Sequence, residues 1–174
     1  PTSALYGSTA PGGLINIITQ TNEKSNETLI KGGFGSLNTA TAMLLQSGRF
    51  DNVGYLLGFN MFRTDGYIQA KEQKAYHTEN GRMDLSLMGK FLVFLDKRSS
   101  LVLGFNHVTE DYSRGIVTDF QHNAASAVNV TYQHRLGRDL DLTASAYFQY
   151  MTRKVSLGAR PDYMVHDHTE TDSG

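Results

Sequence analysis

From residue 27 onward, apolar and polar residues alternate along the chain. The clearest case is Arg82–Val93, where the odd positions from Met83 are apolar or glycine and the even positions are mostly polar. Because successive side chains of a strand point to opposite faces, this period of two predicts a strand with one apolar face. No stretch shows a helical period, so the sequence predicts an all-β chain. Six further strands are predicted, with decreasing regularity, at Leu140–Arg153, Val53–Phe62, Leu101–His107, Val128–His134, Glu27–Phe34 and Leu37–Ser47.

The predicted strands are often about ten residues long or more, the length that a tilted strand needs to cross a membrane. From the second strand onward, short and long connections alternate. Outer-membrane barrels have short periplasmic turns and longer outer loops, and a soluble up-and-down barrel can show the same pattern. The short connections are Arg49–Asn52, Asp96–Ser100 and Gly137–Asp139, and the long ones are Thr64–Gly81, Asp111–Asn123 and Lys154–Gly174.

Composition supports β structure and removes several classes of protein. The chain has nine Tyr, nine Phe, 17 Gly and three Pro, a balance that favours strands over helices. The longest apolar run is only a few residues, which excludes a transmembrane helix. A net charge of -1 gives no general electrostatic reason to expect a nucleic-acid partner. The absence of Cys excludes a disulfide framework and a thiolate metal site.

Charged residues are placed mostly in the predicted loops, with Lys90 as the main exception inside a strand. The inner faces would carry Ser, Thr, Asn, Gln and Gly, which suit a water-filled lumen. Four tyrosines lie in or near predicted strand ends, where a membrane barrel has its aromatic girdles. Cross-strand packing of aromatic rings explains their position equally well. These residues are Tyr55, Tyr112, Tyr132 and Tyr150.

The first 20 residues have a different pattern of apolar and polar residues. Leu14–Ile18 is nearly continuous in apolar residues and follows Gly12-Gly13, so it predicts a strand buried on both faces and entered through a tight turn. Residues 21–26 are polar and form the predicted linker.

Residues 1–19 closely resemble the end of the plug domain of TonB-dependent outer-membrane receptors. The shared pattern is Pro-x-Ser-x-Leu-Tyr-Gly-x-x-Ala-x-Gly-Gly-x-Ile-Asn-Ile-x-Thr. Downstream, Gly33–Ser36 and Asp65–Tyr67 also resemble short sequence motifs that recur in this family's first barrel strands. The motif is structural rather than catalytic, because its glycines allow tight turns and its apolar residues bury a strand. Its main positions are Leu5, Tyr6, Gly7, Gly12, Gly13, Ile15, Asn16 and Ile17.

The resemblance implies that the chain is a fragment of a larger protein and that it consists of three parts. Residues 1–20 would be the C-terminal end of the plug domain, 21–26 a linker, and 27–174 the N-terminal part of an incomplete barrel domain. The expected fold is therefore an antiparallel transmembrane β-barrel portion, about seven strands of a 22-stranded barrel, preceded by the last plug strand. The segment that binds the TonB-type energy-coupling protein is expected to lie outside this chain.

The resemblance also implies a function and a location. Such a receptor sits in the bacterial outer membrane, contacts lipid and lipopolysaccharide, and actively imports a large scarce solute into the periplasm. The solute would be a ferric siderophore, haem, cobalamin or an oligosaccharide. Tyr and Arg in long loops can stack on such ligands and donate charge-assisted hydrogen bonds. The candidate ligand-binding residues are Tyr67, Tyr76, His77, Tyr112, Arg114, His122 and Arg160.

No motif points to catalysis, a cofactor or a metal. The phosphate-binding, dinucleotide-binding, zinc-protease and nucleophile-elbow patterns are all missing from the sequence. Asp139 and Asp141 are interpreted as turn residues, and His166-Asp167-His168 as a solvated loop rather than a metal site. Two other functions stay open: a small outer-membrane barrel acting as adhesin or passive pore, and a soluble β-sandwich that binds glycans. The sandwich predicts that the apolar faces of Met83–Val93 and Leu140–Tyr150 pack on each other.

Overall fold

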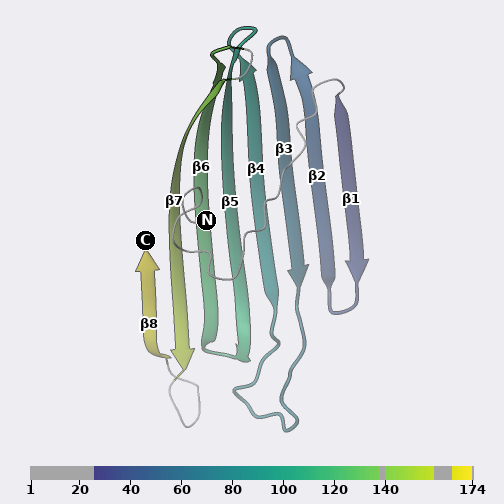
Figure 1. Cartoon of the computed structure of the whole chain (residues 1–174). Coiled ribbons are helices and arrows are strands. Elements are labelled where there is room, and N and C mark those ends of the chain that lie inside the picture. The colour runs from purple at the N-terminus through teal and green to yellow at the C-terminus, as the bar shows by residue number, and fades with distance from the viewer. Residues whose placement is uncertain (1–25, 138–139, 159–165, 174) are drawn as a thin grey trace.

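The computed structural model describes residues 26–137, 140–158 and 166–173, and in these the chain forms one antiparallel sheet (Figure 1). The eight strands follow one another across the sheet in sequence order, each pairing with its neighbours in the chain. The prediction of an all-β chain is confirmed. No helix that could cross a membrane is found among these residues. The strands are β1 (Glu27–Gly35), β2 (Thr39–Phe50), β3 (Val53–Thr64), β4 (Arg82–Phe94), β5 (Ser99–Ile116), β6 (Asp119–Arg135), β7 (Asp141–Gly158) and β8 (His166–Ser173).

All seven predicted strands are present, but two of the predicted long loops are wrong. β5 and β6 are 18 and 17 residues long, and only Val117 and Thr118 connect them. Most of Asp111–Asn123 is therefore strand. Likewise β7 runs on to Gly158 and β8 begins at His166, so Lys154–Gly174 is not one loop. Residues 111–123 are mostly polar on both faces, which removes the alternation that marks a strand in the sequence. The end of β7 still alternates Lys154 and Ser156 with Val155 and Leu157, and the prediction ended this strand too early.

The connections gather at two opposite ends of the sheet (Figure 1). One end, the turn end, holds the tight connection Asp51-Asn52 and residues 95–98. Asp51 has φ of 51°, a left-handed conformation that Asp tolerates in turns. The opposite end, the loop end, holds residues 36–38, the long connection 65–81 and the tip of the β5–β6 hairpin. The predicted long loop between β3 and β4 is confirmed.

The strand register assigns each side chain to one of two faces, because directly opposed residues share a face. One row runs Leu57, Gly89, Phe105, Val128, Phe148 across β3 to β7, and its face is called the apolar face. The Phe105 ring covers Gly89 so closely that a Cβ there would collide with it. The same face also carries Ile30, Leu44, Val53, Phe59, Met61, Leu85, Leu87, Phe91, Leu103, Val130 and Tyr150.

The opposite face, called the polar face, is richer in hydroxyl, amide and charged groups. Thr131 and Ser145, for example, are opposed there and their hydroxyls lie 3.0 Å apart. This distribution agrees with the expected polar inner face. Further residues on this face are Lys31, Thr41, Asn60, Ser86, Lys90, Asn106, Asn129 and Gln149.

The described chain is a single layer, and its apolar face has nothing packed on it. Leu56 and Val155 are the only buried hydrophobic residues found in the described part of the chain. Leu87 and Phe148 are 47% and 67% exposed. The apolar runs of β4 and β7 lie on the same face of one sheet, so they do not pack on each other as a β-sandwich requires.

The height of the apolar face differs between strands: it is largest on β4, whereas on β5 the apolar run extends only from Leu101 to Phe105. On β4 it extends from Met83 to Val93, which at about 3.4 Å per residue is about 34 Å along the strand. A strand tilt of about 35–45° converts this to about 24–28 Å, close to the apolar band of an outer-membrane barrel. Toward the loop end the band stops at Arg63, His107 and Ser126. Strands β5 to β7 continue past it.

The tyrosines expected in girdles do not all share a face. Tyr55, Tyr132 and Tyr150 lie on the apolar face. Tyr112 lies on the polar face, opposite Arg82, so it does not share a face with the other three. The predicted strand ended before Tyr112, so the sequence pattern did not assign this residue to a face. The strand register does.

Candidate functional site

At the loop end, the connection 65–81 docks on the tip of the β5–β6 hairpin. The backbone N–H of Thr78 donates to the carbonyl of Gly115 at 3.0 Å, and that of Val117 donates to the carbonyl of Tyr76 at 3.0 Å. His77 forms an antiparallel bridge with Ile116 between these two bonds. The loop therefore extends the sheet locally and satisfies backbone groups that would otherwise need water.

A tight turn presents the aromatic residues of this loop. The backbone N–H of Lys74 donates to Nδ1 of His77 at 3.1 Å, and the backbone N–H of His77 donates to the carbonyl of Lys74 at 3.0 Å. Since Nδ1 accepts a hydrogen bond, the neutral His77 ring carries its proton on Nε2. The Tyr76 and His77 rings meet edge to face at 4.5 Å, and the Lys74 ammonium lies 5.9 Å from the Tyr76 ring centroid.

The Asp65-Gly66-Tyr67 sequence fixes where the loop leaves β3. Gly66 has φ of 74°, and a Cβ at this position would lie 2.5 Å from the carbonyl oxygen of Asn80. The Tyr67 N–H donates to Oδ1 of Asn80 at 2.7 Å, which ties the two ends of the loop together. The Asn38 amide donates to Asp65 at 2.6 Å and joins this point to the β1–β2 turn.

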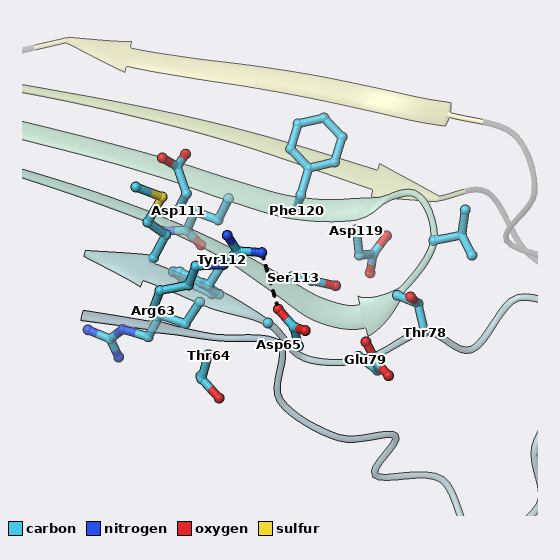
Figure 2. Close-up of a pocket in the computed structure, with 15 residues that line it drawn as sticks. Arg63, Thr64, Asp65, Thr78, Glu79, Asp111, Tyr112, Ser113, Asp119 and Phe120 are labelled. Atoms are coloured by element: carbon cyan, nitrogen blue, oxygen red, sulfur yellow. Dashed lines mark hydrogen bonds and ion pairs between the residues drawn. The ribbon is translucent and has the colours of Figure 1, made fainter. Parts of the chain in front are cut away.

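Between the docked loop and the strands lies a hollow of about 600 Å³ (Figure 2). Thr78 and Glu79 of the loop and Asp119 at the start of β6 lie at one side of it (Figure 2). Carboxylates, hydroxyls and a phenol ring suit a polar ligand with hydrogen-bond donors. The remaining lining residues include Arg63, Thr64, Asp65, Gly81, Arg82, Met83, Asp111, Tyr112, Ser113, Val117, Phe120 and Gln121.

Beside the hollow, a chain of hydrogen bonds crosses the polar face from β4 to β7. It begins at Arg82, whose Nε donates to both carboxylate oxygens of Asp84 at 2.8 and 2.9 Å. The same guanidinium also donates through Nη2 to Glu110 on β5. The bonds are charge-assisted and fix the Arg82 side chain between two carboxylates.

The chain continues through amides. Asn123 Nδ2 donates to Oε2 of Glu110 at 2.8 Å, and Gln121 Nε2 donates to Oδ1 of Asn123 at 2.8 Å. Arg153 on β7 then donates to Oε1 of Gln121 at 3.4 Å. These residues and Arg82 and Asp84 are called the polar-face network. This network was not predicted. Its only signal in the sequence is the polar residues at alternate positions near the ends of these strands.

The structure brings together some of the predicted ligand-binding residues. Tyr76 and His77 sit at the hairpin tip, and Tyr112 lines the hollow. Tyr67 lines a separate hollow of about 470 Å³, next to Asn80. The expected long loop Asp111–Asn123 had placed Tyr112, Arg114 and His122 together, which is wrong because they lie on two strands.

Three of these predicted residues lie away from the hollow or outside the described part. His122 is on the face opposite to Tyr112, where its Nδ1 lies 2.5 Å from Oδ1 of Asp111. Arg114 lies near the tip of β5, in the irregular pairing between Ser113 and Ile116. Arg160 lies outside the described residues, as do the plug-motif positions Leu5, Tyr6, Gly7, Gly12, Gly13, Ile15, Asn16 and Ile17.

At the turn end, Asp96, Ser99 and His134 form a small cluster. The Arg98 N–H donates to Asp96 at 2.6 Å and the Ser99 hydroxyl donates to it at 2.9 Å, and these bonds hold the pKa of Asp96 below its ordinary value. Ser99 Oγ is also 2.8 Å from Nδ1 of His134. Because the serine proton points to Asp96, its oxygen accepts from the His134 ring, the reverse of nucleophile activation. The cluster caps a turn.

No protein-family model, curated protein or solved structure matches this chain. Among residues 26–137, 140–158 and 166–173, no group of three or more metal-ligating side chains is found. His166 and His168, weighed above as metal ligands, lie within β8 rather than in a loop. The functional proposal therefore depends on the faces of the sheet and the site at the loop end.

Proposed function

We propose that this chain is part of a TonB-dependent receptor of the bacterial outer membrane, with β1–β8 in the wall of a 22-stranded barrel. The observation that carries the proposal is the exposed apolar face, which runs continuously from Ile30 on β1 to Phe148 on β7. Burying apolar surface is worth about 25 cal/mol per Å², so a face of this size needs a cover. Lipid chains supply it, and the height of about 24–28 Å on β4 fits.

The edges of the sheet support a larger barrel. Within the described residues, β1 and β8 each pair on one side only. In a membrane every backbone N–H and C=O needs a partner, so a lipid-covered sheet has to close on further strands. The strand number and the plug come from the resemblance of residues 1–19 to the family. The single-sheet arrangement favours this reading over a glycan-binding sandwich.

In this proposal the polar face lines the lumen and the loop end faces the outside of the cell. The hollow beneath the docked loop binds part of the solute, which is a ferric siderophore, haem, cobalamin or an oligosaccharide. A TonB-type energy-coupling protein then pulls on the plug and opens a path through the barrel. The receptor transports the solute without breaking any of its bonds, so it is not an enzyme and needs no cofactor.

Uptake by whole cells tests the transport function. A strain lacking the full-length gene is expected to lose accumulation of one of the four solute classes, and the gene supplied in trans should restore it. A proton-motive-force uncoupler should abolish the restored uptake, because the energy comes from the inner membrane. Uptake that persists with the uncoupler would instead support a passive pore, and binding to surfaces without uptake would support an adhesin.

The chain contains no Trp, which allows a direct test of lipid contact. Phe148 and Tyr147 are adjacent on β7 and lie on opposite faces. In the full-length protein in vesicles, with every Trp outside this chain replaced by Phe, we expect brominated lipids to quench the fluorescence of Phe148→Trp strongly. The matched variant Tyr147→Trp faces the lumen and should be quenched little. Similar quenching of the two variants contradicts the assignment of the faces.

A further inference from the structure

We propose that Asn80 is a site of spontaneous covalent modification, where the side-chain amide is lost and the residue converts to aspartate and isoaspartate. Asn80 lies where the connection 65–81 returns to β4. The reaction needs only the chain itself and water, and it does not require the membrane function proposed above. Its products change a junction that holds the docked loop in place.

The residue that follows Asn80 favours the reaction. Asn80 is the only asparagine in the sequence that precedes a glycine. The modification begins when the next backbone nitrogen attacks the side-chain amide, and a Cβ on that next residue hinders the approach. Glycine has no Cβ, so the Gly81 nitrogen can come close to Cγ of Asn80. Within the described residues the Gly81 N–H donates to no other group, so no hydrogen bond has to break first.

The Asn80 side chain is held against the other end of the loop. The Tyr67 N–H donates to Oδ1 of Asn80 at 2.7 Å, and the Asn80 N–H donates to the Tyr67 carbonyl at 3.3 Å. When the nitrogen attacks, negative charge develops on Oδ1, and an N–H already directed at this oxygen stabilises it. Gly66 leaves room for this arrangement, since a Cβ there would lie 2.5 Å from the same Oδ1 atom.

The neighbouring pair Asp65-Gly66 is the only aspartate followed by glycine, and it lacks these features. A carboxylate that is ionised at neutral pH repels a nucleophile. The Asp65 carboxylate also accepts the Asn38 amide at 2.6 Å, and the Gly66 N–H donates to the Thr64 hydroxyl at 3.3 Å. Of the two pairs, only Asn80-Gly81 therefore has an amide as its target and a nitrogen that is available to attack.

The reaction has two steps. The Gly81 nitrogen forms a bond to Cγ of Asn80 and gives up its proton, the C–N bond of the side-chain amide breaks, and ammonia leaves with that proton. Water then adds to one of the two carbonyl carbons of the five-membered ring and breaks the bond from that carbon to the nitrogen. Opening at Cγ gives aspartate, and opening at the main-chain carbon gives isoaspartate. Overall an amide and a water become a carboxyl group and ammonia, without oxidation or reduction.

The two products affect the docked loop differently. Aspartate keeps the main chain unchanged, and its carboxylate can still accept the Tyr67 N–H. In isoaspartate the main chain runs through the side chain and is longer by one C–C bond, about 1.5 Å. The added length falls between the Asn80 N–H, which donates to Tyr67, and the Gly81 carbonyl, which accepts the Ser113 N–H at 2.9 Å. These two contacts lose their alignment, so isoaspartate is expected to release the loop from β5.

Peptide mass spectrometry of the full-length protein, incubated folded in detergent at mildly alkaline pH, measures the conversion. We expect Asn80 to convert at least about tenfold faster than Asn52, because glycine leaves the attacking nitrogen uncovered. Asn52 is the internal control, since it is exposed in a turn but precedes the branched Val53. Both aspartate and isoaspartate should form at Asn80. Equal rates at the two asparagines, or aspartate as the sole product, would overturn the proposal.

Limited digestion with trypsin tests the effect on the loop. The isoaspartate form is expected to be cleaved at Lys71 or Lys74 about tenfold faster than the unmodified protein, because cleavage follows the population of the released loop. Asn80→Asp is the matched control, since it carries the new charge without the longer main chain, and its cleavage rate should stay within about twofold of the wild type. Equal cleavage of the isoaspartate form and Asn80→Asp would refute the release of the loop.

Discussion

Leu87→Arg in the full-length protein is expected to lower the free energy of unfolding from lipid vesicles by about 2–4 kcal/mol, the cost of Arg on the lipid face near the bilayer midplane. Leu87 lies near the middle of the apolar run of β4 and is 47% exposed on the apolar face. A guanidinium there would have to leave water for hydrocarbon. Denaturant titration of the vesicle-inserted protein measures the loss, and less of the variant should reach the outer-membrane fraction of cells.

Ser86→Arg is the matched control for this prediction. Ser86 precedes Leu87 directly and lies on the polar face, opposite Asn60 and Val108. An Arg at this position would extend into a water-filled lumen, and its cost is expected to be well below that of Leu87→Arg. If the two variants lose the same stability, the two faces of β4 do not meet different solvents and the proposed barrel is wrong.

Gly66→Ala is expected to release the docked loop and to speed its cleavage by trypsin at Lys71 or Lys74 about tenfold or more. A non-glycine residue with positive φ costs about 1–3 kcal/mol, and about 1.4 kcal/mol corresponds to a factor of ten. Here the added Cβ would also lie 2.5 Å from the Asn80 carbonyl oxygen, a backbone atom that cannot move without the loop. Mass spectrometry of the new chain ends, in the detergent-solubilised receptor, measures the cleavage rate.

Gly115→Ala is the matched control, because it adds the backbone strain of a positive φ without the collision expected in Gly66→Ala. Gly115 also has positive φ, 83°, but its nearest neighbour to an added Cβ is the Thr78 carbonyl oxygen at 3.8 Å, an ordinary contact. This variant should therefore raise the cleavage rate by a smaller factor than Gly66→Ala. A rate in Gly66→Ala equal to that of the wild type would mean that the loop does not depend on its junction with Asn80.

Much of the fold was predictable because the alternation of residues is a local signal. Arg82–Val93 shows its apolar face in the sequence, and the structure has β4 at Arg82–Phe94. The prediction failed where both faces are polar, as in residues 111–123, because no alternation remains to distinguish a strand from a loop. The β5–β6 hairpin was consequently predicted to end too early.

The candidate site was less predictable, since it depends on register and on backbone pairing between distant segments. Glu110 and Asn123 are neighbours only because β5 and β6 pair in one particular register. A shift by one residue would move every side chain to the other face. Nothing local in the sequence indicates that His77 would meet Ile116 at a hairpin tip. Tyr76 and His77 were chosen correctly as loop residues, whereas the polar-face network beside them was not predicted.

The neighbour-to-neighbour order of the strands has a consequence for how the chain folds. Hairpins joined by two residues, such as β2–β3 at 51–52 and β5–β6 at 117–118, close at small entropic cost. Closing the roughly eightfold longer connection 65–81 costs about 2 kcal/mol more, at about 0.6 kcal/mol per doubling of length. The pairing of β3 with β4 is therefore expected to form late. The hollow spans this junction, so the ligand site is completed only when the two halves of the sheet have joined.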